Sequence, residues 1–205
     1  MKDAHDPLAT RDSLLGSLAL PRLKAMIAVL VALAMLLSAV LMTRPHPAAA
    51  APLALALAWA AMIDIDRFRL PDILTLPMIA GGLLYAWLIQ HPRLLDYAIG
   101  AAAGYLSLVL VAELFRLLRG KDGLGRGDAK LLAAAGAWLG WAALPAVVFI
   151  AAVTGIAYAV VQRLTRDAPN HAAAHLIPFG PFIVTAFWLL LVTGFQSPLL
   201  LHLIE

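Results

Sequence analysis

Six long segments without Lys, Arg, Asp or Glu set the strongest limit on how this chain can fold. In chain order they are residues 25–42, 45–63, 73–90, 97–112, 131–162 and 176–201. An α-helix needs about 20 mostly apolar residues to cross a bilayer, so each segment has about the length of a span. Segment 131–162 is too long for one ordinary span, and we expect a turn at Gly140–Pro145 to divide it. The pattern therefore predicts an all-α membrane helix bundle of about seven transmembrane helices.

Composition agrees with a membrane protein. Only 13% of the residues are charged and the mean hydropathy is +0.90, whereas a soluble domain carries about 25% charged residues. The absence of cysteine excludes disulfides, thiolate metal sites and a cysteine nucleophile. The net charge of +3 does not indicate a nucleic-acid partner, because the basic residues flank the apolar segments, where a lipid bilayer is the expected partner.

The positions of the basic residues predict how the chain is oriented. With seven spans, 13 of the 15 Lys and Arg residues fall on one side of the membrane, and only Arg44 and Arg93 fall on the other. Basic residues concentrate on the cytoplasmic side. We therefore expect a cytoplasmic N-terminus and an outside C-terminus, with residues 1–24 as a cytoplasmic N-terminal tail and residues 25–205 as the transmembrane domain.

Two aspartates stand at the ends of apolar segments. Asp64 closes segment 45–63 and Asp128 precedes segment 131–162. In the predicted topology both lie on the cytoplasmic side, so they can meet at one membrane face. Two neighbouring carboxyl groups can share a proton and divide the roles of general acid and general base on a water molecule. Gly125 and Gly127 remove side-chain bulk beside Asp128 and permit unusual backbone angles, so another segment can approach closely.

These acids also have simpler structural interpretations. Asp128 is placed like an N-cap residue of the following helix, and this is the favoured interpretation for Asp128 taken alone. Asp64 alone could be an interfacial residue that ends a span. Asp72 follows Pro71 and is expected to cap the helix after it. Lys130 could neutralise charge near Asp128, although contact with anionic lipid is slightly favoured.

Three motifs in order resemble one family. They are "DIDRFRLPDILTLP" with Asp64, Pro71 and Asp72, "GLGRGDAK" with Gly125, Gly127, Asp128 and Lys130, and "PFGP" with Pro178, Phe179, Gly180 and Pro181. Together they closely resemble the type IV prepilin peptidases, which are bacterial GxGD-type intramembrane aspartic proteases. A GxGD sequence alone is weak evidence for this family, but three motifs in this order are specific to it.

The resemblance implies a function. It implies that Asp64 and Asp128 are the catalytic pair of an aspartic endopeptidase in the bacterial inner membrane. It also implies that the substrates are prepilins or pseudopilins of a type IV pilus or type II secretion system, which lose a short basic leader at the cytoplasmic membrane face. Longer members carry two CxxC pairs that bind zinc and also methylate the new N-terminus. This chain has no cysteine, so it resembles the short, peptidase-only members, and we expect neither a metal nor another cofactor.

Two other classes of function stay open at this point. Acids in membrane spans also serve transporters and proton relays, although only Glu113 is plausibly inside a span, where Arg116 can pair with it. The chain could also be a non-catalytic component of a pilus or secretion assembly, since Gly100-x-x-x-Gly104 fits close helix packing with any partner helix. His171 and His175 share a helical face but have no evident third ligand, so no zinc site is predicted.

Overall fold

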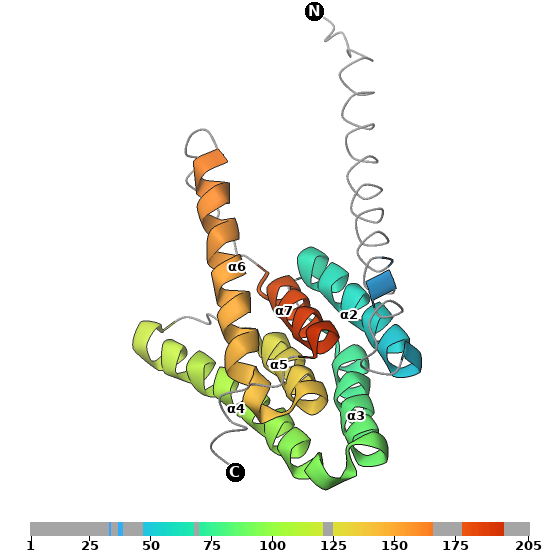
Figure 1. The fold of residues 1–205 in the computed structure, drawn as a ribbon. Helices are drawn as coiled ribbons and strands as arrows, with labels where there is room; N and C mark the ends of the chain where they lie inside the picture. Colours follow the sequence, from blue (N-terminus) through green and yellow to red (C-terminus); the bar gives the residue numbers. More distant parts are fainter. Residues whose placement is uncertain are drawn as a thin grey trace, which may run out of the picture.

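A computed structural model describes residues 33, 37–38, 47–67, 70–120, 125–165 and 178–194. The α-helices in these ranges are α2 (Pro47–Arg67), α3 (Asp72–Ile89), α4 (Leu94–Arg119), α5 (Arg126–Leu139), α6 (Leu144–Thr165) and α7 (Gly180–Thr193). Short 3-10 helices at His91–Arg93 and Trp141–Ala143 connect α3 to α4 and α5 to α6. The described part of the chain contains no strand, which confirms the predicted all-α class there (Figure 1).

Three of the described helical segments are long and apolar enough to cross a membrane. They are Asp72–Ile89, His91–Arg119 and Trp141–Val161, and shorter apolar stretches occupy Ala50–Ile65 and Gly180–Thr193. The chain is thus a membrane helix bundle. The tail 1–24 lies outside the described residues, as does most of segment 25–42, so the count of seven spans and the orientation stay predictions.

The predicted division of segment 131–162 is confirmed. Helix α5 ends at Leu139, and Gly140 follows with a φ of +81°, a left-handed conformation that glycine adopts without a Cβ penalty. Residues Trp141–Ala143 form the 3-10 turn, and α6 begins at Leu144.

Helix α4 is longer than its charge-free segment predicts. It continues through Glu113 and Arg116 to Arg119, because these residues form an ion pair of 2.7 Å one turn apart on the helix surface. Gly120 ends it with a φ of 66° and donates its N–H to the carbonyl of Arg116. A left-handed glycine, and not the first charge, therefore marks the end of α4.

Helix α5 lies at the centre of the bundle, where it contacts α3, α4, α6 and α7 (Figure 1). Ten of its 14 residues are buried, and half of these are alanine. Its closest neighbour is α4, because Gly136 of α5 packs directly on the backbone of Gly100. Gly100 and Gly104, whose spacing fits close helix packing, therefore both pack on the backbone of α5 within this chain.

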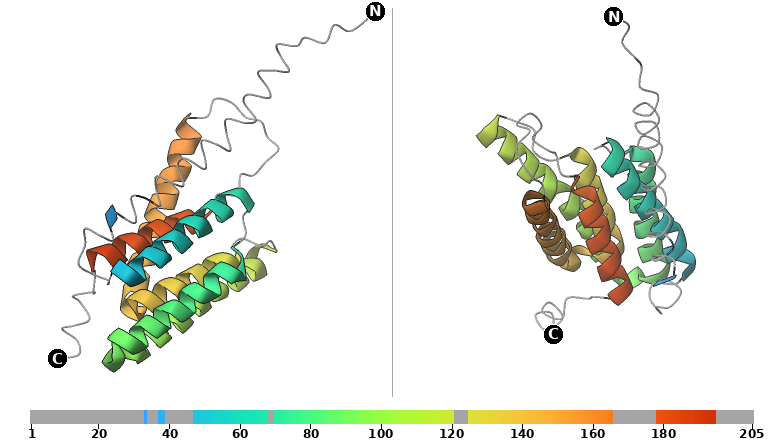
Figure 2. Two further views of the ribbon diagram at one scale, coloured as in Figure 1. Left: turned by 90° about the vertical axis from the view of Figure 1, so that its right-hand side faces the viewer. Right: turned by 90° about the horizontal axis from the view of Figure 1, so that it is seen from above.

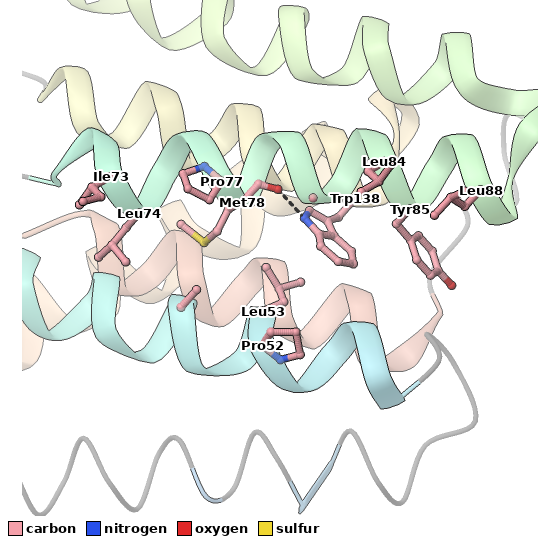
Figure 3. Close-up of a pocket in the computed structure, with 12 residues that line it drawn as sticks. Pro52, Leu53, Ile73, Leu74, Pro77, Met78, Leu84, Tyr85, Leu88 and Trp138 are labelled. Atoms are coloured by element: carbon pink, nitrogen blue, oxygen red, sulfur yellow. Dashed lines mark hydrogen bonds between the residues drawn. The ribbon is translucent and has the colours of Figure 1, made fainter.

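Helix α3 packs on α5 through its buried face. Trp138 of α5 donates its indole N–H to the carbonyl of Met78 at 2.8 Å, and its ring stacks on Tyr85 with centroids 5.5 Å apart (Figure 3). Beside this contact, an almost wholly apolar cavity of about 400 Å³ lies between α2 and α3. The hydrogen bond fixes the position of α3 along α5 and so sets where the first turns of the two helices meet.

Helices α2 and α7 lie side by side (Figure 2). The first residue of α7, Gly180, contacts Asp64 in the last turn of α2, so the two helices run in opposite directions. Lys130 in the first turns of α5 contacts Asp72 at the start of α3. All three motif segments therefore lie at one end of the bundle.

Candidate active site

Asp64 is buried in the last turn of α2. Its side chain is 5% exposed, and its Oδ2 accepts a hydrogen bond of 3.1 Å from the backbone N–H of Gly180. The N–H groups at a helix start have no partner within the helix and carry partial positive charge, so the start of α7 stabilises a negative Asp64. The "PFGP" segment supplies this start, with Phe179 as the N-cap residue and Pro181 in the first turn.

The contact between Asp64 and Gly180 leaves no room for a side chain. A Cβ atom at Gly180 would lie 2.5 Å from Oδ2 and 2.9 Å from Cγ of Asp64. Glycine at this position is therefore required for Asp64 to reach the start of α7. This gives a physical reason for the glycine in the third motif.

Asp128 is buried in the first turn of the central helix α5. Its side chain is 8% exposed. The N-cap residue of α5 is Gly125, in an extended conformation with φ −73° and ψ 136°, and no side chain caps the helix. The interpretation of Asp128 as an N-cap residue is therefore wrong, because the N-cap is Gly125 and the helix begins at Arg126, two residues before Asp128. The burial of Asp128 needs another explanation.

The structure brings Asp64 and Asp128 together. The carboxyl group of Asp128 lies close enough to Asp64 for their charges to interact. Both side chains are buried, one at the end of α2 and the other at the start of α5. Two buried acids whose charges interact cannot both carry a charge at low cost, and sharing one proton between them removes the repulsion.

The two glycines of "GLGRGD" have different surroundings. A Cβ atom at Gly127 would lie 2.8 Å from Cβ of Leu70 and 3.1 Å from its backbone nitrogen, whereas one at Gly125 would make only ordinary contacts, with Asp128 Oδ2 at 3.6 Å. The expected close approach is therefore found at Gly127, where the residue before Pro71 packs. The expected unusual backbone angles are not found, since neither glycine has a positive φ.

Lys130 forms an ion pair with Asp72, between α5 and the start of α3. Asp72 is the first residue of α3, and the N-cap position belongs to Pro71, with no side-chain cap. The predicted capping role of Asp72 is therefore wrong. The structure also pairs Lys130 within the chain, in place of the lipid contact that was slightly favoured.

Two residues at this end of the bundle escaped the sequence analysis. Leu70 is buried against Gly127. The two residues are far apart in the sequence and meet only in the folded chain. Thr75 lies one turn into α3 with a fully buried side chain, and its hydroxyl has no hydrogen-bond partner among the described residues. A threonine in an apolar helix carries no signal that would single it out.

Some candidates lie outside the described residues. His171 and His175 are among them, and the side chain of Asp66 is not described either. Within the described ranges, no group of three His, Asp or Glu residues is arranged to hold a metal ion. The described site offers two buried carboxyl groups and the backbone N–H of Gly180.

Comparison with known proteins identifies relatives. A sequence profile of the type IV leader peptidase family matches residues 51–160, which include Asp64, Asp128 and Lys130 but not the "PFGP" segment. No solved structure matches the chain.

Three relatives illustrate the similarity, and each is named prepilin leader peptidase/N-methyltransferase. The protein of Aeromonas salmonicida (strain A449) is 48% identical over 132 residues, which cover 64% of this chain and 44% of the relative. That of Dickeya chrysanthemi is 46% identical over 127 residues, 62% of this chain and 44% of the relative. That of Pseudomonas aeruginosa is 41% identical over 135 residues, 66% of this chain and 46% of the relative.

The matched region thus spans less than half the length of these relatives. The family profile matches more than half of this chain, and the matched residues include both buried aspartates. The chain belongs to the type IV leader peptidase family.

Proposed function

We propose that the chain is an aspartic endopeptidase that removes the short basic leader from type IV prepilins or pseudopilins at the cytoplasmic membrane face. Family membership and the names of the relatives support a leader peptidase. The observation that carries the aspartic mechanism is that Asp64 and Asp128 are both buried at the same end of the bundle, near enough for their charges to interact.

In the proposed mechanism the two carboxyl groups hold one proton and position a water molecule. The charged carboxylate takes a proton from the water as its oxygen attacks the scissile carbonyl carbon. The protonated carboxyl group donates its proton to the carbonyl oxygen, which gives a gem-diol intermediate. The carboxyl group that took the proton from water then donates it to the leaving amine, its partner takes back a hydroxyl proton of the gem-diol, and the C–N bond breaks. The start of α7 at Gly180 stabilises Asp64 in the states in which its carboxyl group is charged. Either aspartate can take either role, because the pair titrates as a unit.

The proposal includes a topology. Seven spans in the bacterial inner membrane, with the N-terminus in the cytoplasm, place the ends of α2, α3, α5 and α7 that carry the motifs at the cytoplasmic face. The distribution of Lys and Arg supports this orientation. A leader that precedes a membrane-anchored segment would reach Asp64 and Asp128 from that side.

The alternatives make different demands on the same residues. A transporter or proton relay needs acids along a path through the membrane, whereas Glu113 is half-exposed and paired with Arg116 on the surface of α4. A non-catalytic assembly component has no need of two buried carboxyl groups.

Co-expression with type IV prepilins from the same genome tests the proposal, with leader removal scored by a gel shift. If no prepilin of that genome loses its leader when it is co-expressed with this chain, the result would favour the alternatives.

Gly180→Ala is expected to lower the rate of leader removal by about tenfold or more, because a displacement of a catalytic group by about 1 Å can cost a hundredfold. The new methyl group would overlap the carboxyl group of Asp64 and push it from the start of α7. The measurement is the cleavage rate of purified protein. Gly155→Ala in α6 is the matched control, because its Cβ would lie 3.4 Å from the ring of Phe182 and should leave the rate unchanged. Equal rates for both variants would remove Gly180 from the positioning of Asp64.

Cleavage is expected to proceed without an added metal or methyl donor, because two carboxyl groups suffice to activate water. Purified protein given excess chelator, a prepilin and a labelled methyl donor should release the leader and leave the new N-terminus unlabelled. The relatives' names include an N-methyltransferase, so label on the mature N-terminus would contradict the peptidase-only prediction. Loss of cleavage in chelator that zinc restores would instead indicate a metalloprotease.

A further inference from the structure

We infer that the ion pair between Asp72 and Lys130 is a positioning device. It holds the start of α3 on the first turns of α5 and thereby sets the separation of Asp64 and Asp128. The inference rests on the proposed function for its catalytic consequence. Its structural part, that the pair fixes the start of α3 against α5, stands on contacts alone.

The contacts bracket Asp128 on both sides. Gly127, directly before it, is packed against Leu70, and Lys130, two residues after it, is paired with Asp72. The two partners, Leu70 and Asp72, are themselves two residues apart at the entry to α3. The first turn of α5 is thus attached to the entry of α3 at two neighbouring points, one apolar and one charged.

The same entry leads back to the other aspartate. Helix α2 carries Asp64 in its last turn and ends at Arg67, and the chain then runs through Leu70 into α3. A shift of this entry relative to α5 would move the end of α2 relative to Asp128. On the far side, Asp64 is fixed to α7 by the N–H of Gly180. Gly180 therefore fixes Asp64 against α7, and the ion pair fixes the start of α3 against α5, which carries Asp128.

The surroundings of the ion pair favour a positioning role over a stabilising one. The Lys130 side chain is 24% exposed and that of Asp72 is 61% exposed, and ion pairs with this much exposure contribute little to the free energy of unfolding. Small movements of catalytic groups, by contrast, have large effects on rate. Loss of the ion pair should therefore change catalysis and leave the thermal midpoint of unfolding nearly unchanged.

The first test compares single variants with a charge swap in the purified full chain. Lys130→Met and Asp72→Asn should each lower kcat about tenfold, in keeping with a displacement of less than 1 Å, and leave KM unchanged. The double variant should be no slower than either single variant, because both remove the same interaction. Exchanging the charges, with Asp72→Lys and Lys130→Asp in one chain, should recover most of the lost kcat.

A second ion pair in the chain supplies the matched control. Glu113 and Arg116 form a similarly exposed pair one turn apart within α4, so this pair joins no two helices. Arg116→Met should leave kcat and KM unchanged. Wild-type kcat in both Lys130→Met and Asp72→Asn would overturn the inference. So would a raised KM with unchanged kcat, which would mean contact with the substrate, and so would a charge swap no faster than the single variants.

The second test does not depend on activity. The chain has no native cysteine, so nitroxide labels attached through Ile73→Cys and Arg126→Cys report only the distance between the exposed starts of α3 and α5. Lys130→Met should broaden or shift this distance distribution, and Arg116→Met should not. An unchanged distribution would overturn the inference even if the chain is a peptidase. A changed distribution with no cleavage by the wild type would overturn the proposed function alone.

Discussion

Asp64→Asn and Asp128→Asn are each expected to abolish leader removal while the protein stays folded in the membrane. Asparagine keeps the shape of aspartate and can still accept a hydrogen bond from the Gly180 N–H at position 64, but it cannot transfer a proton. Loss of one acid–base group costs a factor of about 10²–10⁴ in rate, and both carboxyl groups are needed to share the proton. The measurement is the cleavage rate of purified variants beside their thermal midpoints of unfolding.

The sequence offers a matched control for this experiment. Asp66 lies in the same "DID" stretch as Asp64, and Asp66→Asn should retain substantial activity. An inactive Asp66→Asn with an active Asp64→Asn would show that the first catalytic aspartate is two residues from the proposed one. An active Asp128→Asn would remove that residue from the mechanism.

Gly136→Ala is expected to cause the largest loss of stability of any single methyl group added to the described helices. Its Cβ would overlap the carbonyl group of Gly100 and lie 2.9 Å from the backbone nitrogen of Ala101. Backbone atoms of two packed helices cannot move aside as a flexible side chain can, so α4 and α5 must separate. Overpacking a core costs about 1–3 kcal/mol, and we expect the free energy of unfolding to fall by at least the upper value.

The control for Gly136→Ala is another helical glycine. At Gly81 in α3 a Cβ would lie 3.6 Å from the ring of Trp138, an ordinary contact, and alanine favours the helix over glycine by about 1 kcal/mol. Gly81→Ala should therefore unfold at the wild-type temperature or above it. Thermal unfolding in detergent measures both variants. A Gly136→Ala protein as stable as wild type would mean that α4 and α5 do not pack as closely as the structure has them.

The sequence predicts the architecture well because membrane helices carry a strong local signal. The apolar segments predict the all-α class, and Gly140 predicts the division between α5 and α6, since a left-handed glycine stops a helix in any surroundings. The predicted pairing of Glu113 with Arg116 is confirmed, because both residues lie within α4 and form an ion pair on its surface. The helix therefore continues past the charge-free segment and ends at Arg119, before the left-handed Gly120.

The candidate site was predictable only in part. The spacing of the motifs picks out Asp64 and Asp128, but a sequence does not show that the start of α7 donates an N–H to Asp64. The roles of Asp72 and Lys130 were misjudged because capping and lipid contact are local explanations, while their ion pair joins helices distant in sequence. The packing of Leu70 on Gly127 is likewise a contact between segments that only the fold brings together.

The most direct measurement is mass spectrometry of the products that the purified chain makes from one type IV prepilin, in chelator and in water enriched in ¹⁸O. If Asp64 and Asp128 activate water for peptide hydrolysis, the leader is released as a single fragment with ¹⁸O in its new carboxyl group. Asp64→Asn and Asp128→Asn should then yield only intact prepilin. An intact prepilin after incubation with the folded wild-type protein, or as much product from the aspartate variants as from the wild type, would contradict an aspartic leader peptidase.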